Sequence, residues 1–162
     1  MPKVAVIMGS ASDLPVIKKG IDLLKQFGVT VDVQVISAHR APIKLAQYAL
    51  AAQEEGVEVV IAAAGKAAHL PGVFAAYTYL PVIGLPILSS FMDGLDSLLS
   101  IVQMPTGIPV ATVGVNAAEN AALLAIQMLC LKYPQLQEEM VRYRKNMADA
   151  LTKAGEEVRA QF

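Results

Sequence analysis

Two histidines, an arginine and several hydroxyl groups lie in three short segments of the sequence. These segments read GSASD at residues 9–13, SAHRAP at residues 37–42 and GKAAHLPG at residues 65–72. Serine hydroxyls and an arginine guanidinium are groups that bind a phosphate, and imidazole is suited to accepting and releasing a proton near neutral pH. The segments together predict a small phosphorylated ligand. For the histidines, a role in proton transfer and a purely structural role are about equally well supported by the sequence.

The first of these segments is also explained by turn formation alone. Glycine, serine and aspartate are common turn residues, so GSASD by itself favours an ordinary strand-to-helix turn over a binding loop. In the binding interpretation Gly9 turns the backbone, while Ser10, Ser12 and Asp13 supply hydroxyls, a helix cap and an acceptor at the positive end of the next helix. Arg40 slightly favours binding, because a cation at the start of a helix is mildly unfavourable.

The elements that must position these segments alternate between strands and helices. Most strands are continuously apolar, as in a sheet covered on both faces, whereas residues 30–36 alternate between valines and polar residues, which is typical of an edge strand. The predicted strands span residues 3–8, 30–36, 58–64, 81–87 and 109–115, and the predicted helices span residues 14–27, 42–55, a short stretch ending at 79, 94–104 and 117–131. This pattern predicts an α/β fold with a parallel sheet of order 2-1-3-4-5, whose crevice lies at the carboxyl ends of strands one and three.

Metal and dinucleotide chemistry have little support in the sequence. With two histidines and one cysteine, no convincing metal site can be assembled, so no metal is expected. Asp93 and Asp96 are better explained as acids at the start of the helix over residues 94–104, which Asp93 can cap. The first loop lacks the GxGxxG pattern, so no cofactor is predicted.

Length and charge restrict the remaining possibilities. A chain of 162 residues fits a single domain, with an α/β core at 1–132 and a C-terminal amphipathic helix at 133–162. The net charge of −1 gives no reason to expect nucleic acid. Proline and glycine interrupt the long apolar tracts, so no membrane span is expected. Cys130 is interpreted as a small core residue, and the composition fits a reducing, cytoplasmic compartment.

The apolar content also predicts self-association. Hydrophobic residues make up 55% of the chain, which is high for its size. Residues 117–131 are apolar almost all round, so we expect a neighbouring subunit to cover part of this helix. The stripe from Leu136 to Val158 predicts a helix that lies on the domain or on another protomer.

Four motifs, in order and over nearly the whole chain, resemble a known family. They read MGSASD, SAHRAP, AAHLPG and GLDSLLSIVQMP, and they are similar to those of class I PurE, the family of N5-carboxyaminoimidazole ribonucleotide mutases of purine biosynthesis. The resemblance implies a three-layer, flavodoxin-like or Rossmann-like sandwich with additional C-terminal helices. It also implies a cofactor-free isomerase that moves a carboxylate from the exocyclic nitrogen of an aminoimidazole ribonucleotide to ring carbon four, and a homo-octamer with its sites near subunit contacts.

The resemblance also assigns roles to individual residues. It implies that His39 is the proton shuttle, that the 5′-phosphate is held by Ser10, Ser12 and Arg40, and that Asp13 binds the ribose hydroxyls. Ser37 and Ala38 would line the site. The wall of a pocket for carbon dioxide would be formed by Gly65, Ala67, Ala68, His69 and Leu70.

The sequence departs from the family pattern in its third loop. That loop usually reads GAGGAAHLPG, and here Ala63 and Lys66 replace glycines, while Ala41 replaces the threonine of SAHRTP. Lys66 either points outward or contacts a carboxylate or phosphate. Two alternatives to the mutase remain: a related carboxylase that uses free carbon dioxide, against which AAHLPG argues, and a non-catalytic nucleotide-binding scaffold, which Lys66 motivates.

Overall fold

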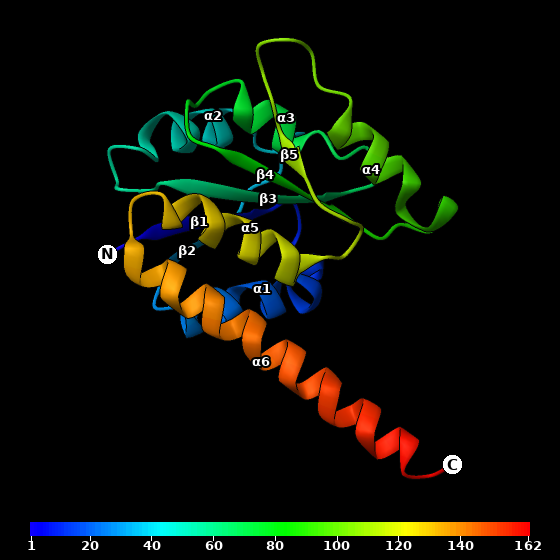
Figure 1. Cartoon of the computed structure of the whole chain (residues 1–162). Coiled ribbons are helices and arrows are strands. Elements are labelled where there is room, and N and C mark those ends of the chain that lie inside the picture. Colours follow the sequence, from blue (N-terminus) through cyan, green and yellow to red (C-terminus); the bar gives the residue numbers. More distant parts are fainter.

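Five parallel strands form one sheet at the centre of the protein, in the predicted order β2-β1-β3-β4-β5 (Figure 1). The computed structural model describes residues 1–162. The strands are β1 (Lys3–Met8), β2 (Thr30–Val35), β3 (Val59–Gly65), β4 (Val82–Ile87) and β5 (Ala111–Thr112). Strands β1, β3 and β4 are buried almost throughout, as their continuous apolar sequences predict.

Strand β5 is much shorter than the predicted residues 109–115. It pairs with β4 only at Ile83 and Gly84, and the last bond of this ladder runs from the Val113 N–H to the Gly84 carbonyl. Pro86 follows in β4 and has no N–H with which to continue the ladder. The missing donor explains why the strand ends early.

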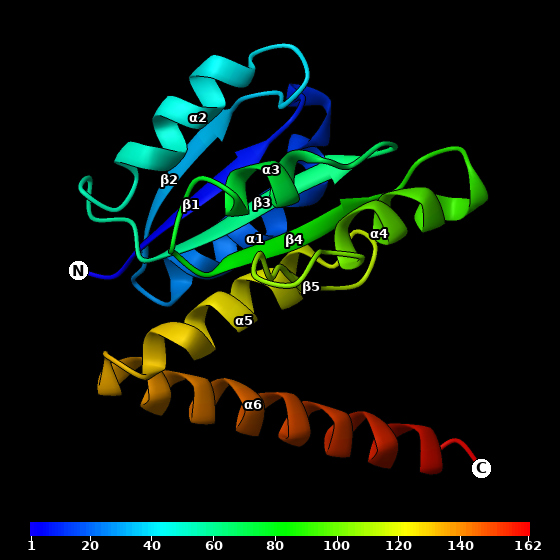
Figure 2. The same ribbon diagram turned by 90° about the horizontal axis from the view of Figure 1, so that it is seen from above.

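The helices cover both faces of the sheet (Figures 1 and 2). One face carries α1 (Leu14–Gln26), α5 (Ala118–Cys130) and the start of α6 (Pro134–Arg159), and the other carries α2 (Pro42–Ala51), α3 (Leu70–Ala75) and α4 (Leu95–Val102). Two hydrophobic cores result, one between the sheet and each helical layer. This is the predicted three-layer sandwich. None of the helices is both long enough and apolar enough to cross a membrane.

The edge strand β2 is covered on an unexpected face. Val33 and Val35 are 42% and 51% exposed, whereas the polar residues between and beside them are half-buried. Asp32 accepts hydrogen bonds from the Tyr48 hydroxyl of α2 at 2.7 Å and from the Gln34 amide at 2.8 Å. The alternation correctly predicts an edge strand, but its polar side is also partly covered, because the Tyr48 hydroxyl of α2 reaches Asp32. On the valine side, Val31 packs against the core that α1 helps to form.

Helices α1 and α5 approach each other very closely at Gly20. A β-carbon placed on Gly20 would lie 2.5 Å from the carbonyl oxygen of Ala118, at the first residue of α5. Only glycine permits this distance between the two backbones. The contact fixes α1, and α1 in turn follows directly from the GSASD loop.

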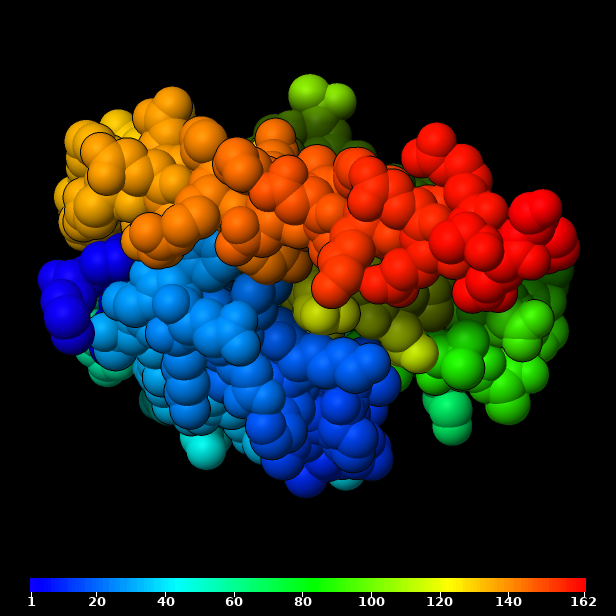
Figure 3. All heavy atoms as spheres, turned by 60° about the horizontal axis from the view of Figure 1, so that its bottom comes forward, coloured from blue at the N-terminus to red at the C-terminus, as the bar shows by residue number.

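Helix α5 is covered on several sides by its own chain, which leaves Leu123, Leu124 and Met128 half-buried. Its buried side chains pack between α1, the sheet and the first turns of α6, where Leu136 and Met140 are buried. Figure 3 shows α6 as a ridge of orange and red atoms crossing the blue α1 and the yellow α5. The C-terminal half of α6 extends beyond the domain in both ribbon views.

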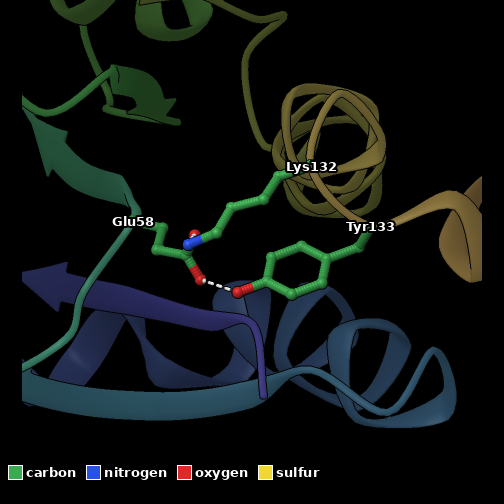
Figure 4. Close-up of polar contacts among 3 residues, drawn as sticks. All are labelled: Glu58, Lys132 and Tyr133. Carbon is green, nitrogen blue, oxygen red and sulfur yellow. Dashed lines mark hydrogen bonds and ion pairs between the residues drawn. The ribbon is translucent and has the colours of Figure 1, made fainter.

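An ion pair at the start of β3 connects Glu58 to the segment between α5 and α6. Glu58, immediately before β3, accepts hydrogen bonds from the Lys132 ammonium at 2.6 Å and the Tyr133 hydroxyl at 2.7 Å (Figure 4). Burial opposes the charge on Glu58, but these two donors outweigh it and lower the pKa of the Glu58 carboxyl. The carboxylate therefore stays ionised where the two helices meet.

Helix α4 begins differently from the prediction. Met92, Asp93 and Gly94 all have positive φ angles, and Asp93 makes no capping hydrogen bond. An N-cap residue ordinarily has an extended backbone, which the φ of 53° at Asp93 does not provide. The expectation that Asp93 caps this helix was therefore wrong. Asp96 does lie in the first turn, where it accepts a hydrogen bond from the Ser89 hydroxyl at 2.6 Å.

Candidate active site

A pocket of about 640 Å³ opens at the carboxyl ends of the central strands. The loops after β1, β2 and β3 all reach it, as the predicted strand order requires. Its lining includes Gly9, Ser10, Ser12, Asp13, Ser37, Ala38, His39, Arg40, Gly65, Lys66, Ala67 and Leu70. Three segments that are distant in the sequence thus form one concave surface.

The loop after β1 forms a compact group of hydroxyls. The Ser10 hydroxyl accepts hydrogen bonds from the Ser12 N–H and, at 2.8 Å, from the Ser12 hydroxyl. Ser10 thereby caps a short 3₁₀ turn at Ala11–Asp13, while Asp13 makes no capping bond to α1. The loop therefore caps this short turn through Ser10, whereas the side-chain cap expected for the following helix is absent.

Arg40 joins the second loop to the first. Its guanidinium donates a hydrogen bond of 2.8 Å to the Gly9 carbonyl, and its own N–H donates to the Ser37 hydroxyl at 3.2 Å. The cation is therefore held at the loop that carries Ser10 and Ser12, and all three residues line the same pocket. This corner of the pocket offers the charge and the donors that bind a phosphate group.

The two histidines of the chain contact each other between the second and third loops. His39 Nε2 lies 2.9 Å from His69 Nδ1, and the ring planes meet at 80°. Only one proton can occupy this contact, so one nitrogen donates and the other must be unprotonated. The pair therefore contains an acceptor and a donor that can exchange roles, as a proton shuttle requires.

Asp13 is the carboxyl group of the pocket lining. Burial raises the pKa of Asp13, against hydrogen bonds from the Ser12 hydroxyl and the Ser10 backbone that lower it. The charged form is thus partly disfavoured by its surroundings. A ligand hydroxyl that donates to this carboxylate would compensate for the lost hydration.

Two residues of the third loop do not line the pocket directly. Ala68 is fully buried in the core between the sheet and α2 and α3. His69 reaches the site through its contact with His39. The remaining predicted residues of this loop, Gly65, Ala67 and Leu70, line the pocket.

A fourth loop contributes residues that the sequence analysis missed. Ile87, Leu88 and Ser89 line the pocket at the end of β4, and Ala64 does so at the end of β3. The signal was available in the predicted strand order, because β4 lies beside β3 and its carboxyl end borders the same crevice. Ala64, Ile87 and Leu88 are apolar and Ser89 belongs to none of the three polar segments, so the sequence gave no reason to select them.

The fold and the pocket define a doubly wound α/β protein with a pocket at the switch point of the sheet, where such sheets bind ligands. Residues 3–150 match the profile of the family described as AIR carboxylase. The chain belongs to this family.

Similar proteins cover nearly the full chain. The N5-carboxyaminoimidazole ribonucleotide mutase of Pyrococcus abyssi is 60% identical over 147 residues, which span 91% of this chain and 84% of the relative. The chloroplastic phosphoribosylaminoimidazole carboxylase of Vigna aconitifolia is 51% identical over 94% of this chain, which spans only 27% of that relative. The crystal structure of Treponema denticola PurE superposes with a TM-score of 0.86 at 26% identity, covering 97% of this chain and 98% of that one.

Proposed function

We propose that this protein is a mutase that interconverts N5-carboxyaminoimidazole ribonucleotide and 4-carboxyaminoimidazole ribonucleotide in the synthesis of the purine nucleotide IMP. Its family and the name of the Pyrococcus abyssi relative support this activity. The observation that carries the proposal is the 2.9 Å contact between His39 and His69 in the same pocket as the Ser10 and Arg40 corner. A proton shuttle and a phosphate site are the two parts that the reaction needs.

The substrate is proposed to bind by its two polar ends. The 5′-phosphate lies at the corner formed by Ser10, Ser12 and Arg40, where hydroxyl donors and a guanidinium converge. The ribose hydroxyls donate to Asp13, and Ser37 and Ala38 line the site beside them. This orientation directs the aminoimidazole ring toward His39.

The proposed reaction proceeds in two steps. In the first, the bond between the exocyclic nitrogen and the carboxyl carbon breaks, carbon dioxide forms, and His39 delivers its proton to that nitrogen. In the second, ring carbon four attacks the carbon dioxide, and His39 recovers a proton from that carbon. The imidazole ends in its starting state, so no other reactant is consumed.

Carbon dioxide must remain in the pocket between the two steps. We assign its wall to the third loop, where Gly65, Ala67 and Leu70 line the pocket. Two further residues of this loop support the wall, Ala68 from the core and His69 through its contact with His39. Leu70 and Ala68 are buried, and Ile87 adds an apolar side chain from β4. A dry wall limits the loss of the intermediate to water.

Turnover of the purified protein tests the activity. We expect the protein to convert N5-carboxyaminoimidazole ribonucleotide to the 4-carboxy isomer without ATP, added metal or bicarbonate. The absorbance of the product measures this conversion. Formation of the isomer at only the uncatalysed rate would refute the mutase, and would leave the non-catalytic scaffold as the alternative.

Two matched histidine variants test the shuttle. His39→Asn should lower turnover by about a thousandfold, the usual contribution of a general acid and base, while calorimetry finds product binding nearly unchanged. His69→Asn removes only the partner of His39 and should cost less. A larger loss in His69→Asn than in His39→Asn would exchange the two roles.

The name of the Vigna aconitifolia relative favours one further candidate, a carboxylase that uses free carbon dioxide. The two activities differ in their carbon source. A carboxylase would form product from aminoimidazole ribonucleotide and labelled bicarbonate at low concentration. The mutase would retain the label of N5-carboxylated substrate even when unlabelled bicarbonate is present.

We also propose that the protein forms a homo-octamer in the cytoplasm. Helix α6 carries exposed apolar side chains at Val141, Met147, Leu151 and Val158, and β2 exposes Val33 and Val35 on a separate part of the surface. Such area is normally covered by association. Light scattering should give the mass of eight chains, and a monomeric mass would contradict this proposal. Cell fractionation tests the compartment.

A further inference from the structure

Lys66 occupies a backbone position that is unfavourable for its residue type. It follows β3 directly and has a φ of 58°, in the left-handed region. A residue with a β-carbon costs about 1 kcal/mol more than glycine in that conformation. Strained positions of this kind concentrate at functional sites, where the surrounding structure maintains them.

The Lys66 side chain lines the pocket without a partner in the chain. The ion pairs of the protein involve other lysines, on α1 and near or on α6. Within the lining, the positive charges come from Lys66 and Arg40, and the carboxyl group from Asp13. A ligand whose only anionic group is a phosphate would need only one of these two cations.

The two cations belong to different parts of the pocket. The Arg40 guanidinium is bonded to the Gly9 carbonyl, in the loop that carries the two serines. Lys66 lies in the third loop, between Gly65 and Ala67, and the same loop carries His69. An anion beside the histidines would therefore meet Lys66, while a phosphate in the serine corner would meet Arg40.

We propose that Lys66 binds the carboxylate of the substrate and product, and so distinguishes carboxylated from uncarboxylated ribonucleotide. This inference rests on the proposed mutase function and adds a ligand-binding residue to it. A lysine ammonium attracts both carboxylates of the reaction but not neutral carbon dioxide. It therefore stabilises the substrate and product more than the intermediate, so its loss should raise KM without lowering kcat.

Three variants separate the charge from the backbone. Lys66→Asn removes the charge and tolerates the left-handed conformation, and Lys66→Arg keeps the charge. Lys25→Gln is the matched control, because Lys25 is an exposed lysine in the last turn of α1 and does not line the pocket. Calorimetry measures the affinity for 4-carboxyaminoimidazole ribonucleotide and for aminoimidazole ribonucleotide, which lacks the carboxylate.

We expect Lys66→Asn to bind the carboxylated ribonucleotide about tenfold more weakly, the low end for a hydrogen bond between charged groups. Its affinity for aminoimidazole ribonucleotide should stay within about twofold of the unmodified protein, since no carboxylate contact is lost. KM for the N5-carboxylated substrate should rise by a similar factor without a fall in kcat. Lys66→Arg should restore most of the loss, and Lys25→Gln should change neither affinity.

Other outcomes overturn the inference in distinguishable ways. An equal loss for both ribonucleotides would move Lys66 to the phosphate. No loss for either would leave its side chain without a ligand. If the unmodified protein bound neither ribonucleotide, the mutase function would be refuted together with this inference. If the unmodified protein turned over normally and Lys66→Asn kept the same affinities and KM, only the role of Lys66 would be refuted.

Discussion

Substitution of Gly20 by alanine tests the closest approach between two helices of the fold. Gly20 lies inside α1, where alanine is intrinsically the better helix former by about 1 kcal/mol. An alanine β-carbon at this position would lie 2.5 Å from the Ala118 carbonyl oxygen and 3.1 Å from its carbonyl carbon. Helix propensity and packing therefore make opposite predictions.

The structure indicates that packing dominates. The obstructing atoms belong to the backbone of α5, so they cannot rotate away and the two helices must separate. Overpacking of this kind costs about 1–3 kcal/mol, and a backbone obstacle places Gly20→Ala near the upper end. After subtraction of about 1 kcal/mol for helix propensity, we expect a net loss of about 2 kcal/mol. The melting temperature should fall by roughly 4–8 °C for a chain of this size.

Gly155→Ala is the matched control. Gly155 lies inside α6, and a β-carbon added there would meet nothing within 4 Å. Only the propensity term remains, so this variant should gain up to about 1 kcal/mol. Urea unfolding followed by circular dichroism, at one fixed protein concentration, measures both. A gain in Gly20→Ala equal to that in Gly155→Ala would refute the close contact.

Three further substitutions or reactions test other parts of the structure. The pKa of the Glu58 carboxyl is lowered in the folded protein, so this carboxylate stabilises the fold at pH values above its ordinary pKa of 4.5. That stabilisation is lost as the pH falls through the lowered pKa. The difference in unfolding free energy between the unmodified protein and Glu58→Gln should therefore shrink over that acidic range. Burial raises the pKa of the Cys130 thiol, so it should react with a disulfide reagent at pH 7 more slowly than a free thiol, and rapidly after unfolding. Gly84→Ala should destabilise the protein, because the added carbon would overlap the Ile101 side chain. Ile101 is fully buried, so Ile101→Ala also destabilises, but the double variant should lose less unfolding free energy than the sum of the two single losses.

The central part of the fold is predictable because its sequence signals are local and strong. The apolar run of β1 and the glycine that follows it define a buried strand and its end, and β2 differs from it by clear alternation. These two observations determine the sheet order. That order then brings the loops of Ser10, His39 and Lys66 to one pocket.

The features that escaped prediction depend on tertiary contacts. The polar face of β2 is covered because the Tyr48 hydroxyl reaches Asp32 from another helix, which no pattern within residues 30–36 reveals. The early end of β5 depends on Pro86 in the neighbouring strand. Asp93 has the composition of a cap, but the left-handed backbone of its loop prevents that role.

The candidate site is predictable in its loops and less so in its contacts. Motif and strand order select His39 and His69, yet the direct hydrogen bond between their rings follows only from the path of both loops. Leu88 and Ser89 belong to none of the motifs, and they line the pocket because β4 lies next to β3.

The contacts that build the pocket join residues far apart along the chain. The Arg40 bond to Gly9 spans 31 residues, and the contact between His39 and His69 spans 30. Each contact therefore depends on one strand–helix–strand crossover, through α1 for Gly9 and Arg40 and through α2 for His39 and His69. A ribonucleotide that bridges these loops binds the completed sheet and no earlier state, so its presence should protect the newly folded chain and raise its melting temperature with ligand concentration.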